Sequence, residues 1–432
     1  MPHHSRNGSS SRSKSPPWDD ADSPTHKPSN SLLPLSTSNG SLGGSSKRQA
    51  GRVWQIWDTP AGQKIFVGLI IFFYFGIGGG MVFQEHVLLW TGVYKFNYPM
   101  FVTAAQLITA QVMLVFWAYL TRLITPVFYF IQFGFVVAPP DPPVYQKVQG
   151  WGWGARGSVL EFEWKTGRKF IFASAVFSLK ILISNFAFAY GQFPVYQMSR
   201  ILTIPFALFF ATYLQSQTLP VTTLSSALSV TFGLFMTSLR HVRFAPEGFI
   251  AGLFSSFFTA LHPFTLLQAY NIMLENLNTG PTSPGNNNPS YEDHQRAFWR
   301  LLWYINTFSL MFIVPLSIIT GSWHEVYRTC YFLDAGYFWF MLWLSGLLGL
   351  LCFIFMLGMI RLTSPLTAIV ANGPRAASTT ALLSYFKMQI YSWVGFWMTW
   401  ISTYWYYKGR KQSLVREREE ARGRGSVEYE MH

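Results

Sequence analysis

Long, mainly apolar runs dominate this sequence and restrict the folds that it can adopt. About ten runs have the length, roughly 20 residues, at which an α-helix crosses a bilayer. They cover 64–90, 98–120, 170–190, 194–213, 219–239, 248–272, 298–320, 337–360, 362–385 and 390–407. Only 12% of the 432 residues are charged, against about 25% in a soluble domain. The sequence therefore predicts an all-α membrane protein with ten transmembrane helices.

Polar segments divide the chain around these runs. The first 52 residues are rich in Ser, Pro, Gly and Asn and have little to bury, so we predict a disordered tail. A membrane domain follows, and then a short charged tail. The predicted boundaries are 1–52 for the first tail, 64–407 for the membrane domain, 64–240 and 247–407 for its halves, 274–297 for a hydrophilic loop, and 408–432 for the second tail.

The basic residues predict the orientation and the partners. The formal net charge is +13, but much of the Lys and Arg lies in the tails and next to span ends. That distribution is typical of topology signals and of contacts with anionic lipid, and it argues against nucleic acid as a partner. An even number of spans puts both termini on one side, which the basic tails identify as the cytosol.

The ninth run carries polar residues where a membrane helix rarely has them. Asn372 and Arg375 are three residues apart, so a helix places both on one face. Pro374, between them, predicts an interruption of the helix. An Arg near a span end reaches the interface, but Arg375 follows Thr363 by about twelve residues, roughly 18 Å of helix. We therefore interpret Arg375 as part of a polar cavity within the membrane.

The fourth run repeats this arrangement with Gln197 and Arg200, again three residues apart. Each half contains five predicted spans, an odd number, so the second half enters the membrane in the opposite sense. This pattern predicts two inverted five-helix repeats, whose binding sites lie near the midplane. Two Arg converging from opposite halves suit an anion with more than one phosphate, because guanidinium binds phosphate bidentately.

Several runs in this order resemble the triose-phosphate and nucleotide-sugar transporter family of the drug/metabolite transporter superfamily. The resemblance rests on 96–106, 185–190, 196–200, 302–306 and 363–375. It implies a ten-helix antiporter that exchanges a nucleotide sugar, or another sugar phosphate, for phosphate or a nucleoside monophosphate. It also implies a multi-pass protein of the Golgi or endoplasmic reticulum. The Ser-Pro-Leu-Thr form at 364–367 is similar to that of GDP-fucose carriers and of plastid phosphate carriers, whereas the runs typical of GDP-mannose carriers are absent.

The resemblance assigns roles to seven residues. Arg200 and Arg375 occupy places where the family often has Lys, and they would hold the diphosphate with Lys180 as a third cation. Hydrogen bonds to sugar or base are assigned to Asn372, Gln197, Tyr196 and Asn306. A structural ion pair explains Lys180 equally well, and helix–helix hydrogen bonds, worth roughly 0.6 kcal/mol, explain Tyr196 and Asn306 better.

Two other functions are alternatives to transport. A departure from the family at Glu85-His86, together with the polar tails, favours a membrane scaffold or receptor that no longer transports. An intramembrane enzyme is disfavoured, because neither Cys330 nor Cys352 has the partners of a nucleophile or a metal site. We therefore expect no enzyme activity, no metal and no cofactor, and the sequence leaves a homodimer open.

Overall fold

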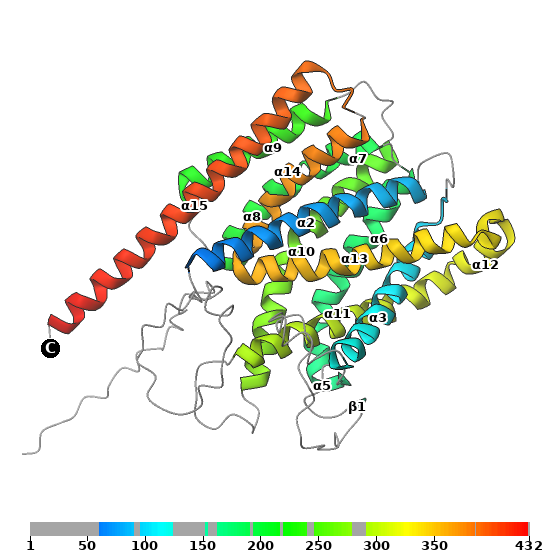
Figure 1. Ribbon diagram of the computed structural model, residues 1–432, viewed down its shortest axis with the longest axis horizontal. Helices are drawn as coiled ribbons and strands as arrows, with labels where there is room; N and C mark the ends of the chain where they lie inside the picture. The colour runs from blue at the N-terminus through cyan, green and yellow to red at the C-terminus, as the bar shows by residue number, and fades with distance from the viewer. Residues whose placement is uncertain are drawn as a thin grey trace, which may run out of the picture.

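The computed structural model describes residues 60–89, 96–123, 152–153, 162–190, 193–216, 219–239, 246–278, 291–384 and 386–430. These residues are almost entirely helical (Figure 1). The predicted tail 1–52 and the centre of the predicted loop 274–297 lie outside them. The long helices are α2 (Pro60–Leu89), α3 (Pro99–Leu123), α6 (Ile171–Tyr190), α8 (Thr203–Gln215), α9 (Val221–Ser238), α10 (Pro246–Asn278), α11 (Tyr291–Ile319), α13 (Gly336–Leu362), α14 (Pro365–Leu383) and α15 (Ile390–Glu430).

Short elements connect some of these helices. They are the two-residue strands β1 (Gly152–Trp153) and β2 (Phe162–Glu163), which pair antiparallel, and the helices α5 (Trp164–Gly167), η1 (Arg168–Phe170), α7 (Phe193–Arg200), α12 (Ser322–Thr329) and η2 (Tyr331–Asp334). The C-terminal helix α15 continues without interruption past the predicted boundary at 408.

Within the described part of the chain, eight helical segments are long and apolar enough to cross a membrane. They correspond to the first eight predicted spans, which supports an all-α, multi-pass membrane protein. Helices α14 and α15 lie at the ninth and tenth predicted positions but are less apolar, because α14 carries Asn372 and Arg375 and α15 is rich in Trp and Tyr. The arrangement of ten spans in two repeats stays a prediction.

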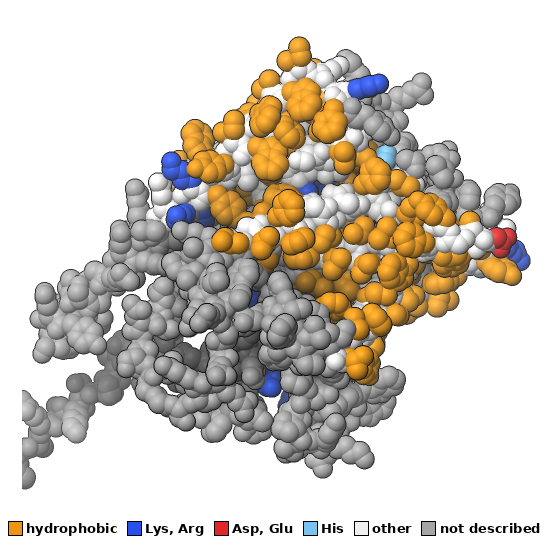
Figure 2. Space-filling view, in the orientation of Figure 1, with side chains coloured by type: hydrophobic (Ala, Val, Ile, Leu, Met, Phe, Trp, Pro, Cys, Tyr) orange, Lys and Arg blue, Asp and Glu red, His pale blue; other side chains and the backbone are white. Residues whose placement is uncertain are grey.

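The outer surface has the composition expected beside lipid. Figure 2 shows hydrophobic side chains spread across the face on which α2, α13 and α15 lie, with few Lys or Arg among them. Phe72 on α2 and Trp397 and Trp405 on α15 are exposed by 60% or more. Monomeric soluble proteins rarely expose apolar patches of this extent. The surface therefore agrees with a bilayer as the surrounding solvent.

The helices pack so that α2 lies between α13 and α14, and α9 lies beside α15 at one edge (Figure 1). Helices α9 and α15 come close together at two glycines, Gly233 and Gly395. A Cβ built at Gly395 would lie 2.6 Å from the carbonyl oxygen of Gly233 and 2.6 Å from the amide nitrogen of Thr237. Only glycine at position 395 permits the two backbones to come this close.

The fourth predicted run is divided into two helices. Helix α7 ends at Arg200, and α8 begins at Thr203. Pro205 explains the division, because it has no N–H to bond the carbonyl of Ile201 and its ring would clash with that carbonyl in a continuous helix. Proline is tolerated in a first helical turn, so α8 restarts with Pro205 there. Arg200 is left as the last residue of α7.

Helix α14, by contrast, is continuous. Ser364 caps its N-terminus by accepting a 3.2 Å hydrogen bond from the amide of Thr367, and Pro365 occupies the first turn. The predicted interruption at Pro374 is wrong, because the residues on both sides of it remain helical. The break lies instead in the fourth run, between Arg200 and Thr203.

Candidate functional site

A central cavity of about 100 Å³ lies among the helices. It is smaller than the roughly 300–1,000 Å³ usual for ligand pockets. Helices α2, α3, α6, α7, α10, α11, α13 and α14 all contribute to its wall. The polar and charged residues that line it are Tyr74, Glu85, Gln106, Lys180, Ser184, Arg200, Thr259, Asn306, Cys352, Asn372 and Arg375.

Arg375 enters this cavity from the middle of α14. Its guanidinium carbon lies 5.2 Å from the centre of the Tyr74 ring on α2, and Nη1 lies 3.8 Å from Sγ of Cys352. The Tyr74 hydroxyl donates a 2.8 Å hydrogen bond to Oδ1 of Asn372, one turn earlier on α14. The ring is thus fixed beneath the cation, an attractive arrangement for a desolvated guanidinium.

Arg200 enters from the end of α7 and also lies over a tyrosine. Its guanidinium carbon is 5.1 Å from the centre of the Tyr196 ring. One nitrogen donates to the Tyr196 hydroxyl, and another donates to Oγ1 of Thr259 at 3.0 Å. Ser184 extends this chain through a 2.9 Å hydrogen bond with the Tyr196 hydroxyl. These contacts orient Arg200 through neutral groups and leave its charge unneutralised.

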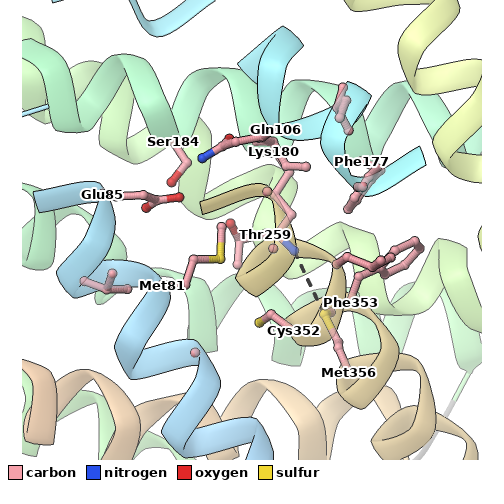
Figure 3. A pocket seen from close by; sticks show the side chains of 18 of the residues that line it. Met81, Glu85, Gln106, Phe177, Lys180, Ser184, Thr259, Cys352, Phe353 and Met356 are labelled. Carbon is pink, nitrogen blue, oxygen red and sulfur yellow. Dashed lines mark hydrogen bonds between the residues drawn. The ribbon is translucent and has the colours of Figure 1, made fainter. Parts of the chain in front are cut away.

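Lys180 and Glu85 complete the set of charged residues in the cavity (Figure 3). The ammonium of Lys180 points toward Met356, 3.9 Å from its sulfur atom. Glu85 extends from α2 toward the side of the cavity formed by Ser184 and Gln106. Among the described lining residues, three cations thus face one carboxylate, and no ion pair joins them.

A second cavity, of about 50 Å³, adjoins the first. Arg200, Arg375 and Asn372 line both cavities, and Tyr196 and Gln197 line the second. Lys180 and Asn306 line the central one. The structure therefore gathers all seven sequence-predicted residues around two adjoining spaces, with both guanidiniums at their junction. Their role in binding a substrate stays a prediction.

Some polar residues of the cavity wall have structural partners instead. Asn306 donates hydrogen bonds to Oε1 of Gln111 at 2.5 Å and to the carbonyl of Leu107 at 3.3 Å, and so joins α11 to α3. Gln106 accepts from Asn185 at 3.0 Å and donates to Ser345 at 2.7 Å. These contacts favour the helix–helix alternative for Asn306.

Sequence reasoning missed Tyr74, Thr259 and Ser184. A signal was present in the spacing of α2. Tyr74, Gly78, Met81 and Glu85 all line the central cavity, and their separations of four, three and four residues place them on one helical face. Which face of α2 lies inside the protein depends on how α13 and α14 pack against it, and the spacing of residues along α2 does not predict that packing.

Gly78 makes room for Arg375, which leads to a prediction. A Cβ built at Gly78 would lie 2.9 Å from Cδ of Arg375. Because this neighbour is a flexible side chain, we expect Gly78→Ala to fold and to displace the guanidinium. Ala in a helix is also favoured over Gly by about 0.5–1 kcal/mol. Substrate transport should fall by roughly tenfold, the equivalent of about 1.4 kcal/mol, while thermal stability in detergent is retained or raised.

Gly76 is the matched control for this variant. It lies on the same helix, and a Cβ there would meet no atom within 4 Å. Gly76→Ala should therefore gain the same helix propensity and transport normally. Equal transport by the two variants would show that Gly78 is not needed to position Arg375.

The fold and the cavity together define a class: a multi-pass α-helical membrane protein with a cationic internal cavity. No protein-family profile matches the chain. It is 28% identical over 322 residues to GDP-fucose transporter 1 of Dictyostelium discoideum, covering 74% of this chain and 73% of that protein. It is 27% identical over 241 residues to GDP-fucose transporter 1 of Mus musculus, covering 54% of this chain and 60% of that protein.

These relatives confirm the resemblance to the nucleotide-sugar transporter family. They are named as transporters and not as enzymes, which supports the prediction of a protein without enzyme activity. A solved structure titled "Crystal structure of protein" covers 82% of this chain and 98% of its own, with a TM-score of 0.49 and 12% identity. Likeness at that level says nothing about function.

Proposed function

We propose that this protein carries a GDP-sugar across an intracellular membrane in exchange for GMP, and that GDP-fucose is the first substrate to test. The site of exchange is the junction of the two cavities, where Arg200 and Arg375 hold the phosphates. No covalent bond is made or broken. The halves 64–240 and 247–407 would rock about the site and expose it to each side in turn.

The charge balance of the central cavity is the observation that carries this proposal. Lys180, Arg200 and Arg375 face Glu85, so the formal excess is two positive charges. A nucleotide sugar carries one negative charge on each of two phosphates. A nucleoside monophosphate carries about −1.5 to −2 at pH 7. Either ligand neutralises the excess, and Arg is the side chain best suited to bidentate phosphate contact.

Matching contacts in the two halves support the repeat arrangement. Gly78, on the first helix of one half, accommodates Arg375 on the fourth helix of the other. Gly252, on the first helix of the second half, accommodates Ser199 next to Arg200, since a Cβ there would lie 2.6 Å from Cβ of Ser199. The packing of α6 on α10 likewise corresponds to that of α13 on α2. Paired contacts of this kind favour an inverted repeat.

The nucleotide and the organelle are inferred from the relatives. Both are named as GDP-fucose transporters. Guanine is therefore the first base to test, and fucose is the first sugar. The Golgi or the endoplasmic reticulum is the expected location, with both termini in the cytosol. Lipid contacts follow from the apolar outer surface.

Counterflow in proteoliposomes tests the proposal. Vesicles holding purified protein and preloaded with GMP should accumulate radiolabelled GDP-fucose at least tenfold faster than empty vesicles. Vesicles preloaded with AMP or UMP serve as the control and should give little acceleration. Acceleration is expected because the binding site changes the side to which it opens most readily when a ligand neutralises its charge.

The same assay separates transport from its rival. No accumulation of GDP-fucose, GDP-mannose or any UDP-, CMP- or ADP-sugar under these conditions would contradict the transport proposal and leave the scaffold or receptor. Equally fast uptake into empty vesicles would support transport of GDP-fucose but contradict its exchange for GMP.

A further inference from the structure

Glu85 is a buried carboxylate that makes no hydrogen bond and no ion pair to the described part of the chain. It is 4% exposed, and Arg200, Arg375 and Lys180 act on it only through longer-range charge interactions. Leaving a charge or polar group buried and unpaired is costly. Since Glu85 faces the cavity (Figure 3), a ligand is well placed to complete its hydrogen bonds.

The neighbouring polar groups already have protein partners. Ser184 is bonded to Tyr196, and Thr259 accepts from Arg200. The amide oxygen of Gln106 accepts from Asn185, and that of Asn372 accepts from Tyr74. Glu85 is therefore the acceptor in this part of the cavity with both oxygens uncommitted to the described protein groups.

Its position along α2 sets its distance, along the helix axis, from the place where Arg375 contacts Gly78. Gly78, which contacts Arg375, and Glu85 are seven residues apart, so about 10.5 Å of helix separates them at 1.5 Å per residue. This is about the span of a nucleotide from its phosphates to the far edge of its base. A phosphate between the arginines would leave the base within reach of Glu85.

A carboxylate in this place discriminates among bases. Guanine presents two donors side by side, N1–H and the exocyclic 2-amino group, and a carboxylate accepts both in parallel. Adenine and cytosine present an amino donor beside a ring acceptor, and uracil presents one N–H between two carbonyls. When any of these three bases donates one hydrogen bond to Glu85, it also places an acceptor atom against the second carboxylate oxygen, and the two lone pairs repel each other.

We propose that Glu85 is the specificity-determining residue for guanine, holding N1–H and the 2-amino group while Arg200 and Arg375 hold the phosphates. This inference rests on the proposed function and deepens it. It explains why an acid lies in a cavity otherwise arranged for anions.

The experiment measures competition for radiolabelled GMP bound to the purified protein by GMP, IMP, XMP and AMP. The wild type should prefer GMP over IMP, which lacks the 2-amino group, by about 10- to 100-fold, the effect of one hydrogen bond to a charged group. Glu85→Gln should lose this preference and gain affinity for XMP, because the Gln amide donates to the C2 carbonyl of xanthine and accepts N1–H. Radiolabelled XMP measures that gain directly.

Two controls isolate the role of the base. Pyrophosphate should compete equally well in the wild type and in Glu85→Gln if the phosphate contacts are intact. Glu325→Gln, which changes an exposed acid on α12, should keep the wild-type preference.

Each remaining outcome decides the matter. Unchanged ratios among GMP, IMP and AMP in Glu85→Gln would overturn the inference and leave the phosphate site standing. Tighter binding of all nucleotides by one common factor would identify Glu85 as a counter-ion of the arginines and also overturn it. A wild-type protein that binds no nucleotide would contradict the proposed function itself.

Discussion

Replacing Arg375 by Gln is expected to reduce GDP-fucose exchange by 100-fold or more while leaving the protein folded. A guanidinium makes two charge-assisted hydrogen bonds to a phosphate, each worth about 1.5–3 kcal/mol, and Gln cannot replace them. Arg375→Lys should retain part of the activity, because it keeps the charge but loses the bidentate geometry. Initial rates of counterflow in proteoliposomes measure both effects.

The stability of this variant should change in the opposite direction. Arg375 is partly buried and pairs with no acid among the described residues, and an uncompensated charge away from water is costly. Arg375→Gln should therefore unfold in detergent at the wild-type temperature or above it. Arg328→Gln, an exposed Arg on α12, is the control and should leave both readouts unchanged. Near-normal exchange by Arg375→Gln would contradict the proposal that this residue binds the substrate.

Gly395→Ala is expected to be the most damaging of the glycine substitutions to stability. The added methyl group would meet backbone atoms of Gly233 and Thr237 at 2.6 Å, and these can move only if α9 and α15 separate. Overpacking costs typically 1–3 kcal/mol, and we expect about 3 kcal/mol here because no side chain can rotate away. The apparent melting temperature in detergent should fall by several degrees.

Gly409 provides the comparison on the same helix. A Cβ there would lie 3.6 Å from Oγ1 of Thr222, an ordinary contact. Gly409→Ala should therefore be neutral or stabilising by about 0.5–1 kcal/mol. If both Gly395→Ala and Gly409→Ala have the melting temperature of the wild type, the close packing of α9 and α15 does not depend on glycine.

The positions of the helices were largely predictable, because hydrophobic length alone marks a membrane span. The sixth predicted span, 248–272, lies within α10, and the eighth, 337–360, lies within α13. The ends were less predictable, since polar flanks such as those of α10 and α11 continue the helix beyond the apolar run. Proline alone does not show which run is divided, because Pro374 lies inside the continuous α14 whereas Pro205 lies in the first turn of α8.

The site was predictable only in part. Intramembrane charge marked Arg200, Arg375 and Lys180, and the structure brings all three to one cavity. The partners that orient them were not marked, since the contact between Tyr74 and Arg375 joins residues about 300 positions apart. Such a pairing depends on how α2 packs against α14, and one sequence does not contain that information.

The division between α7 and α8 distinguishes the two arginines mechanically. Arg375 lies inside a continuous helix, so its backbone can move only with the whole of α14. Arg200 lies at a joint where backbone hydrogen bonding is interrupted, and a small change of angle there swings its guanidinium without breaking a helix. If the two arginines hold a phosphate as we propose, the movement that closes the site would therefore come mainly from the side of Arg200, where α7 and α8 are separate helices.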